Sequence, residues 1–408
     1  MMTTKEDALI TPVNKNERMD ILDILRGFAI FGILVVNIIG MAGPVWLPGY
    51  EAPALAWYDR LAETMVNFLA TGKFYVIFSF LFGLGFSIQM LRAEEKGRKL
   101  RSFYPRRLLI MFAFGVLHAV FFFIGDILRL YAILGFLLLV FRKRSNRTLI
   151  IWALIFLLLN FGAIGLAGGP LADAGEVPEQ FNVLEIAREI YTEGSFLQVS
   201  LFQLGTSFIA FFSMTLSQGG TVMALFLMGL LAGRQRIFQN LSKHRETFKK
   251  VFVWSLLLGI LLNAAFIIFA QSPWISSFSW IIGAPILGTA YVTGLSLLRL
   301  NKGGARWLQP IGNVGRMALT NYLMHSVIGA LIFNGYALGL YEQVGPLGLW
   351  GITIGVYLAQ IPVSTWWLSK YHFGPMEWLW RALTYKQRPP FVKKAHGEKE
   401  AFASPRRS

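Results

Sequence analysis

The sequence contains no cysteine, and only 15% of its 408 residues are charged. The lack of cysteine excludes disulfide bonds, thiolate metal ligands and a thiol nucleophile, although it indicates nothing about the compartment. In a soluble domain about a quarter of the residues are usually charged. The chain is instead 55% hydrophobic, with 35 Phe and 12 Trp, and this composition is typical of a membrane protein.

Long apolar runs predict an all-α, polytopic membrane protein, because a bilayer-crossing helix needs about 20 mostly apolar residues. We expect six spans in an N-terminal membrane half, 19–233, and four in a C-terminal membrane half, 234–385. A polar segment, 1–18, precedes them, and a basic tail, 386–408, follows and is expected to be disordered. The ten expected spans are 25–43, 65–91, 108–124, 127–141, 148–167, 208–233, 251–270, 277–298, 313–338 and 347–369.

One further apolar stretch, 197–216, follows a long outer loop near 168–207. Counting it as an eleventh span would place the basic segment that follows residue 233 outside the cell. We therefore expect 197–216 to be interfacial or re-entrant.

The distribution of basic residues predicts that both termini are cytoplasmic. With ten spans in this orientation, all Lys and Arg lie on the inner side except Arg60, Lys73, Arg129 and Arg188. Membrane insertion therefore accounts for the net charge of +16, and no nucleic-acid partner is needed to explain it. We expect the basic loops to contact anionic membrane lipid.

Three expected spans carry polar side chains at one depth. At about 1.5 Å per helical residue, His118, Asn37 and Asn321 lie near the bilayer centre, and Asp126 lies at the outer rim. Ionisable groups inside a membrane are costly and are functional by default. We therefore predict catalytic roles for these four residues and no metal site. In the alternative interpretation the amides only join helices, and Asp126 pairs with Arg129.

Basic residues at the inner ends of the spans are candidates for binding a cofactor. They are Arg26, Arg106, Arg107 and Arg316, with Asp23 beside the first. An arginine fork matches a phosphate group well. By spacing alone, a local ion pair between Asp23 and Arg26 is the simpler interpretation.

Five motifs follow one another along the chain: DILDILRGFAIFGILVVNI, KFYVIFSFLFGLGF, RRLLIMFAFGVLHAVFFFIGDILRLYA, GRMALTNYLMHSVIGALIFNGYALGLY and GPMEWLWRALTY. Together they resemble the YeiB-like family of bacterial inner-membrane proteins, whose C-terminal half is a domain of unknown function. The resemblance extends from Met19 to Tyr385. The chain departs from the family at His325, where the family more often has glutamine, and this weakens a catalytic role for that histidine.

That family is similar, more distantly, to transmembrane acyltransferases such as the lysosomal heparan-α-glucosaminide N-acetyltransferase. Their opening motif, Asp-x-x-Arg-Gly followed by an asparagine, matches Asp23, Arg26, Gly27 and Asn37. Their catalytic histidine follows on the non-cytoplasmic side, where this chain has none. The resemblance implies that the chemistry has moved to another residue, such as His118, or that the family does something else.

The sequence thus predicts an acyltransferase of the bacterial inner membrane. Acyl-CoA would be the co-substrate on the cytoplasmic face, and the acceptor would be an envelope sugar, an amine or a lipid-linked molecule. His118 would be the general base, because imidazole titrates close to neutral pH. The alternative is a secondary transporter of a small molecule that uses the same polar layer. The sequence is also compatible with a homo-oligomer.

Because the chain has no cysteine, the expected topology can be tested with single engineered thiols. In intact cells, we expect a membrane-impermeant maleimide to label Gly49→Cys and to label Gly97→Cys only after permeabilisation. The reverse pattern would contradict the orientation.

Overall fold

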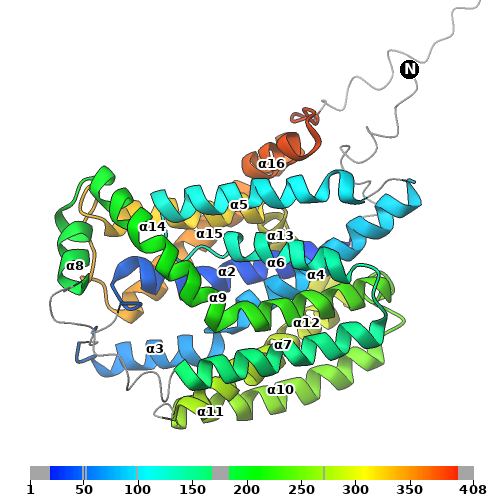
Figure 1. Cartoon of the computed structure of the whole chain (residues 1–408), viewed down its shortest axis with the longest axis horizontal. Coiled ribbons are helices and arrows are strands. Elements are labelled where there is room, and N and C mark those ends of the chain that lie inside the picture. Colours follow the sequence, from blue (N-terminus) through cyan, green and yellow to red (C-terminus); the bar gives the residue numbers. More distant parts are fainter. Residues whose placement is uncertain are drawn as a thin grey trace, which may run out of the picture.

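The computed structural model describes residues 19–47, 50, 53–97, 100–167, 183–269 and 272–393. These residues are almost entirely helical (Figure 1), and within them extended pairing is limited to one isolated bridge, Tyr371 with Val392. The polar segment 1–18 lies outside the described residues. The expected all-α, polytopic membrane fold is confirmed.

The helices follow one another with short connections. In chain order they are α2 (Asp20–Ala42), α3 (Trp57–Leu69), α4 (Lys73–Glu95), α5 (Tyr104–Phe121), α6 (Leu128–Phe141), α7 (Asn146–Ala167), α8 (Val183–Glu193), α9 (Phe196–Arg234), α10 (Arg245–Ile268), α11 (Pro273–Phe278), α12 (Ala284–Leu300), α13 (Lys302–Arg316), α14 (Ala318–Phe333), α15 (Pro346–Lys370) and α16 (Pro375–Tyr385). A 3₁₀ turn, Leu100–Ser102, precedes α5, and a π-helical turn, Ser279–Gly283, precedes α12.

Among the described residues, eight helical segments are long and apolar enough to cross a membrane. Two further apolar helices, α6 with 14 residues and α14 with 16, are shorter. At 1.5 Å per residue they measure about 21 and 24 Å, less than the hydrocarbon core of about 30 Å. The ten expected spans each overlap one of these ten segments. Two of the ten, α6 and α14, are shorter than the hydrocarbon core of a bilayer.

Helix α9 differs from the expectation for the stretch 197–216. It runs without a break over 39 residues, from Phe196 to Arg234. Its start is fixed by a capping box, in which Ser195 N donates to Gln198 Oε1 over 2.8 Å and Gln198 N donates to Ser195 Oγ over 3.4 Å. The stretch is therefore the first half of one long helix, and it does not form a separate interfacial or re-entrant element.

Basic loops meet at one end of the bundle. Arg234, at the end of α9, donates to the backbone carbonyls of Arg142 and Arg144 in the loop after α6, over 2.6 and 2.7 Å. Arg236 pairs with Glu95, at the end of α4, over 3.2 Å. We call this the basic end of the bundle, and its loops are the ones that the sequence places in the cytoplasm.

The opposite end is closed by α8, and we call it the α8 end (Figure 1, left). Arg188 of α8 binds Glu342 through two hydrogen bonds of 2.9 and 3.1 Å. Gly335, just after α14, donates its N–H to the carbonyl of Tyr191 over 2.8 Å. The loop between α14 and α15 is thereby held to α8.

Helix α2 is central, and it packs against α4, α12, α13, α14 and α15. It approaches α13 backbone to backbone: a Cβ on Gly27 would lie 2.0 Å from the carbonyl oxygen of Ile311, and one on Gly315 would lie 1.8 Å from that of Asp23. Small residues permit such close helix crossings in membranes. The first helix is thus built into the C-terminal helices, and the two expected membrane halves share one core.

The C-terminal tail is ordered further than expected. Val392 bridges Tyr371, and His372 N donates to Phe391 O over 2.9 Å. The Phe391 ring lies 4.8 Å from the Tyr371 ring. The expectation of disorder is therefore wrong for 386–393. The polar composition of the tail gives no sign of this aromatic contact. The residues after 393 lie outside the described residues.

Candidate functional site

The site begins where α5 ends. The carbonyl of His118 accepts hydrogen bonds from the N–H groups of Phe122 and Phe123, both over 3.0 Å, and the chain then reverses before α6 begins at Leu128. On a straight helix, Asp126 would lie about 12 Å from His118 along the axis. The reversal instead brings the Asp126 carboxylate back against the imidazole.

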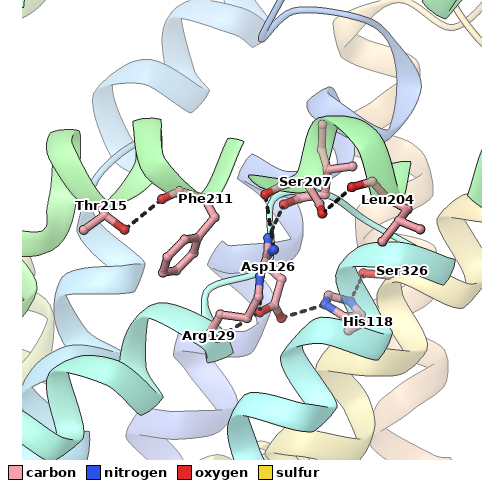
Figure 2. A network of polar contacts seen from close by, with 9 residues as sticks. His118, Asp126, Arg129, Leu204, Ser207, Phe211, Thr215 and Ser326 are labelled. Carbon is pink, nitrogen blue, oxygen red and sulfur yellow. Dashed lines mark hydrogen bonds and ion pairs between the residues drawn. The ribbon is translucent and has the colours of Figure 1, made fainter. Parts of the chain in front are cut away.

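Three residues from α5, the α5–α6 connection and α14 form a continuous chain of hydrogen bonds (Figure 2). His118 Nδ1 lies 2.8 Å from Asp126 Oδ2, and His118 Nε2 lies 2.8 Å from Ser326 Oγ. The three side chains are buried, with at most 2% of any of these residues exposed. We call this chain the Asp126–His118–Ser326 triad.

The two partners of His118 indicate which of its ring nitrogens carries the proton. An ionised carboxylate only accepts hydrogen bonds, so Nδ1 of a neutral His118 carries the proton and donates to Asp126. Nε2 is then left as an acceptor for the hydroxyl of Ser326. This is the arrangement in which a carboxylate orients a base, and the base activates a hydroxyl.

Arg129 compensates the charge of Asp126. Its backbone N–H donates to Asp126 Oδ1 over 3.0 Å, and its guanidinium Nε lies 3.6 Å from the same oxygen. The guanidinium also donates to the carbonyl of Ser207 on α9 (Figure 2) and to the carbonyl of Ile124, both over 3.2 Å. A buried charge is tolerated only when it is paired and hydrogen-bonded, and both members of this pair are.

Two neighbours shape the triad. A Cβ on Gly115, one turn before His118, would lie 2.5 Å from Asp126 Oδ1, so a side chain there would displace the carboxylate. The Tyr322 ring lies 5.0 Å from the imidazole. Gly115 therefore makes room for the triad, and Tyr322 covers one side of His118.

A small cleft of about 40 Å³ lies at the α8 end beside the triad. Phe122, Phe123 and Ile124, which separate His118 from Asp126 in the chain, line it. Gly329 and Ala330, one turn beyond Ser326, line it too. The remaining wall includes Met41, Trp46, Tyr191, Gln203, Asn334 and Tyr341.

Two short helices, α6 and α14, have an end close to the triad and the cleft. Helix α6 begins two residues after Asp126, and α14 ends seven residues after Ser326. Both helices are shorter than a hydrocarbon core. The α5–α6 connection and the last turns of α14, which flank the triad, form part of the cleft wall.

The two asparagines expected at the site are not bonded to the triad. The side-chain amide of Asn321 donates to Val314 O over 3.0 Å and to Ser364 Oγ over 3.1 Å, and so joins α14 to α13 and α15. Asn37 is half-buried on α2, and the hydrogen bonds of the described residues do not connect it to His118. The structure therefore brings together His118 and Asp126 and adds Ser326, without Asn37 or Asn321.

His325 joins two helices and is not bonded to the triad. Its Nε2 lies 2.9 Å from Gln360 Oε1 on α15, and the Gln360 amide donates to the carbonyl of Asn321 over 3.3 Å. This pair holds α14 against α15, and it turns Ser326, the next residue, towards α5.

The cofactor candidates lie at the basic end. Arg26 donates to Asp23 over 3.1 Å, which is the local ion pair that spacing alone favours, and a third of its side chain stays exposed. Arg106 donates to Thr384 O over 3.0 Å, and the Arg107 guanidinium lies 3.5 Å from the centre of the Trp380 ring. Both α5 arginines are thereby held against α16.

The fifth candidate, Arg316, closes α13 near the start of the tail. Burial, followed by the positive charges of Lys393 and Arg316, lowers the pKa of His372. Arg316 therefore lies in a positively charged region at this end of the bundle.

Helix α16 connects the two helices that carry His118 and Ser326. Trp380 Nε1 donates to the Arg107 carbonyl on α5 over 3.0 Å. The Glu377 carboxylate accepts the N–H groups of Leu319 and Thr320, over 2.7 and 3.1 Å, and so caps α14. Burial raises the pKa of Glu377.

Comparison with known proteins places the chain in a family. It is 28% identical to YeiB of Escherichia coli (strain K12) over 400 residues, covering 93% of this chain and 99% of the relative. It is 34% identical to YxaH of Bacillus subtilis (strain 168) over 401 residues, covering 94% and 98%. The chain belongs to the YeiB-like family. Both relatives are described as uncharacterized proteins.

A third relative of this YeiB-like chain is a 39.9 kDa protein encoded beside an amylase in Bacillus acidopullulyticus, 29% identical over 95% of this chain and 99% of the relative. The family described as "Protein of unknown function (DUF418)" matches residues 232–387. No solved structure matches. The matched segment contains Ser326 and not His118 or Asp126, so the triad joins the DUF418 part of the YeiB-like chain to the helices before it.

Sequence reasoning missed Ser326. Serine is common in apolar helices, where it usually bonds to its own backbone, and no spacing relates residue 326 to residue 118. The only signal was indirect: Ser326 follows a histidine in the motif GRMALTNYLMHSVIG. The contact became visible only when α5 and α14 were placed together.

The pairing of Asp126 with Arg129 can be tested by removing one charge or both. We expect Arg129→Met to destabilise the protein by about 3–5 kcal/mol, because it leaves a buried carboxylate without its partner. The double variant Asp126→Asn/Arg129→Met removes both charges and should recover part of this loss. Thermal unfolding in detergent measures the difference.

Arg188→Met is the matched control, because its pair with Glu342 is largely exposed and should contribute at most about 1 kcal/mol. A double variant that is less stable than Arg129→Met alone would contradict charge compensation.

Proposed function

We propose that this protein is a transmembrane acyltransferase of the bacterial cytoplasmic (inner) membrane. It moves an acyl group from cytoplasmic acyl-CoA to an envelope sugar, an amine or a lipid-linked acceptor. The observation that supports this proposal is the Asp126–His118–Ser326 triad beside the cleft at the α8 end. A carboxylate–imidazole pair that is bonded to a hydroxyl, inside an apolar bundle, is an arrangement suited to general-base catalysis of acyl transfer.

His118 acts as the general base. Its Nδ1 proton is held by Asp126 over 2.8 Å, so Nε2, which contacts Ser326 Oγ at 2.8 Å, is the ring nitrogen that takes up a proton during transfer to a hydroxyl or amine. Arg129 keeps Asp126 oriented through contacts with two of its donor groups. As the imidazole takes up the proton, the fixed carboxylate stabilises the positive charge that develops.

The donor and the acceptor approach from opposite ends in this proposal. The phosphates of acyl-CoA bind at the basic end, where Arg26 is partly exposed and Arg107 lies on the same helix as His118. Eleven residues separate Arg107 from His118, about 16 Å along α5. The acceptor enters the cleft at the α8 end, next to Phe123 and Gly329.

A test of the chemistry is transfer of radiolabelled acetyl from acetyl-CoA into the lipid and sugar fractions of membranes that contain the protein. We expect His118→Gln to lower this transfer at least about 100-fold, since the amide keeps a hydrogen bond to Asp126 but cannot accept a proton. His244→Gln is the control, a histidine at the start of α10 and outside the site, and should transfer at nearly the wild-type rate. Equal rates for wild type and His118→Gln would overturn the proposal.

The donor site has its own test. Binding of a phosphate by arginine depends on its paired, charge-assisted hydrogen bonds, so Arg26→Lys should weaken acetyl-CoA binding at least about tenfold. Isothermal titration of the purified protein measures this, with Arg236→Lys, an exposed pair with Glu95, as the control. If wild type binds no acyl-CoA at millimolar concentration, the acyltransferase proposal fails, and uptake of small molecules into proteoliposomes becomes the assay to pursue.

A further inference from the structure

The hydroxyl of Ser326 differs from its counterparts in the other helices. Ser200, Thr206, Thr215 and Ser296 each donate to a carbonyl four residues earlier in their own helix, over 2.7–2.8 Å. Such back-bonding is how serine and threonine usually satisfy a hydroxyl inside an apolar helix. Among the hydrogen bonds of the described residues, the Ser326 hydroxyl has an imidazole as its partner, His118 Nε2 at 2.8 Å.

We propose that Ser326 is a nucleophile that carries the acyl group as an ester between the donor and the acceptor. This inference rests on the proposed acyl transfer and adds a covalent intermediate to it. Ser326, His118 and Asp126 stand in the order nucleophile, base and orienting carboxylate, and each adjacent pair is in hydrogen-bond contact at 2.8 Å. A serine hydroxyl is a weak nucleophile at neutral pH unless an adjacent base takes its proton.

In the first step, Ser326 Oγ attacks the carbonyl carbon of a thioester donor. The hydroxyl proton passes to His118 Nε2 as the oxygen–carbon bond forms. The carbon–sulfur bond then breaks, and the departing thiolate takes the proton from His118 Nε2. The products are an acyl ester on Ser326, a free thiol and a neutral His118.

In the second step, a hydroxyl or amine of the acceptor attacks the acyl ester. Its proton passes to His118 Nε2, the ester bond to Ser326 Oγ breaks, and the same proton returns to Ser326. No oxidant or reductant is needed, and the triad is restored.

The position of Ser326 suits this sequence. Gly329 and Ala330, one turn away on α14, form part of the cleft wall. Gly329 packs against the thioether of Met41, and a Cβ on Gly329 would lie 2.5 Å from the Met41 sulfur. Met41 also lines the cleft. A methionine side chain is flexible, so its movement would extend the cleft towards Ser326. A covalent intermediate also allows a donor from the basic end and an acceptor from the α8 end to use one site in turn.

The decisive experiment is isotope exchange without acceptor. Purified protein in detergent is incubated with acetyl-CoA and radiolabelled free CoA. If Ser326 is acylated, the reverse of the first step transfers label into acetyl-CoA. We expect wild type to exchange, and Ser326→Ala to lose exchange at least about 100-fold, as loss of a nucleophile does in a triad.

Ser296→Ala is the matched control, because Ser296 is equally buried and its hydroxyl donates to Val292 O in its own helix. Mass spectrometry of acid-quenched wild type gives a readout that does not depend on how a variant folds. It should find one acetyl group on the peptide that contains Ser326, and none in His118→Gln.

The failures of the two proposals are distinguishable. If Ser326→Ala transfers acetyl into membrane acceptors as fast as wild type while His118→Gln does not, transfer is direct, and the acyl-serine is wrong while the acyltransferase stands. Wild type that transfers acetyl but shows neither exchange nor an adduct on Ser326 would likewise mean direct transfer. If wild type does not transfer acetyl at all, the proposed function itself fails.

Discussion

The buried pair of Asp126 and Arg129 is the interaction on which the site depends. Two opposite charges inside an apolar bundle are stable only when they are paired and make further hydrogen bonds. Asp126 therefore turns back towards α5, and Arg129 reaches the carbonyl of Ser207 on α9. The pair thereby connects the reversal between α5 and α6 to α9.

Ser326 is positioned by hydrogen bonds that other residues of α14 make. Helix α14 is capped by Glu377, joined to α15 by the pair of His325 and Gln360, and joined to α13 by Asn321. These contacts fix the rotation of α14 about its axis, and the rotation decides that Ser326 faces His118. Helix α16 bonds both α5 and α14, and so links the basic end to the two helices that carry His118 and Ser326.

Polar residues in a membrane bundle can serve catalysis or only hold helices together, and the polar residues of this protein make two kinds of contact. Asn321 and His325 connect one helix to the next through amide and carbonyl groups, which is a structural role. The triad instead ends in a hydroxyl and lies beside a cleft.

The sequence by itself determined the fold class, because the bilayer requires long apolar helices and leaves few alternatives. It also determined which loops lie together, since the basic loops of the predicted inner side meet at one end. It pointed to His118 and Asp126, because ionisable residues in apolar runs are conspicuous. Only the tertiary structure decided that these two touch, that α9 is one continuous helix, and that Ser326 and not Asn37 or Asn321 completes the chain. Those facts depend on where a helix ends and how it is rotated, and such properties arise from packing between distant segments and leave no periodic trace in the sequence.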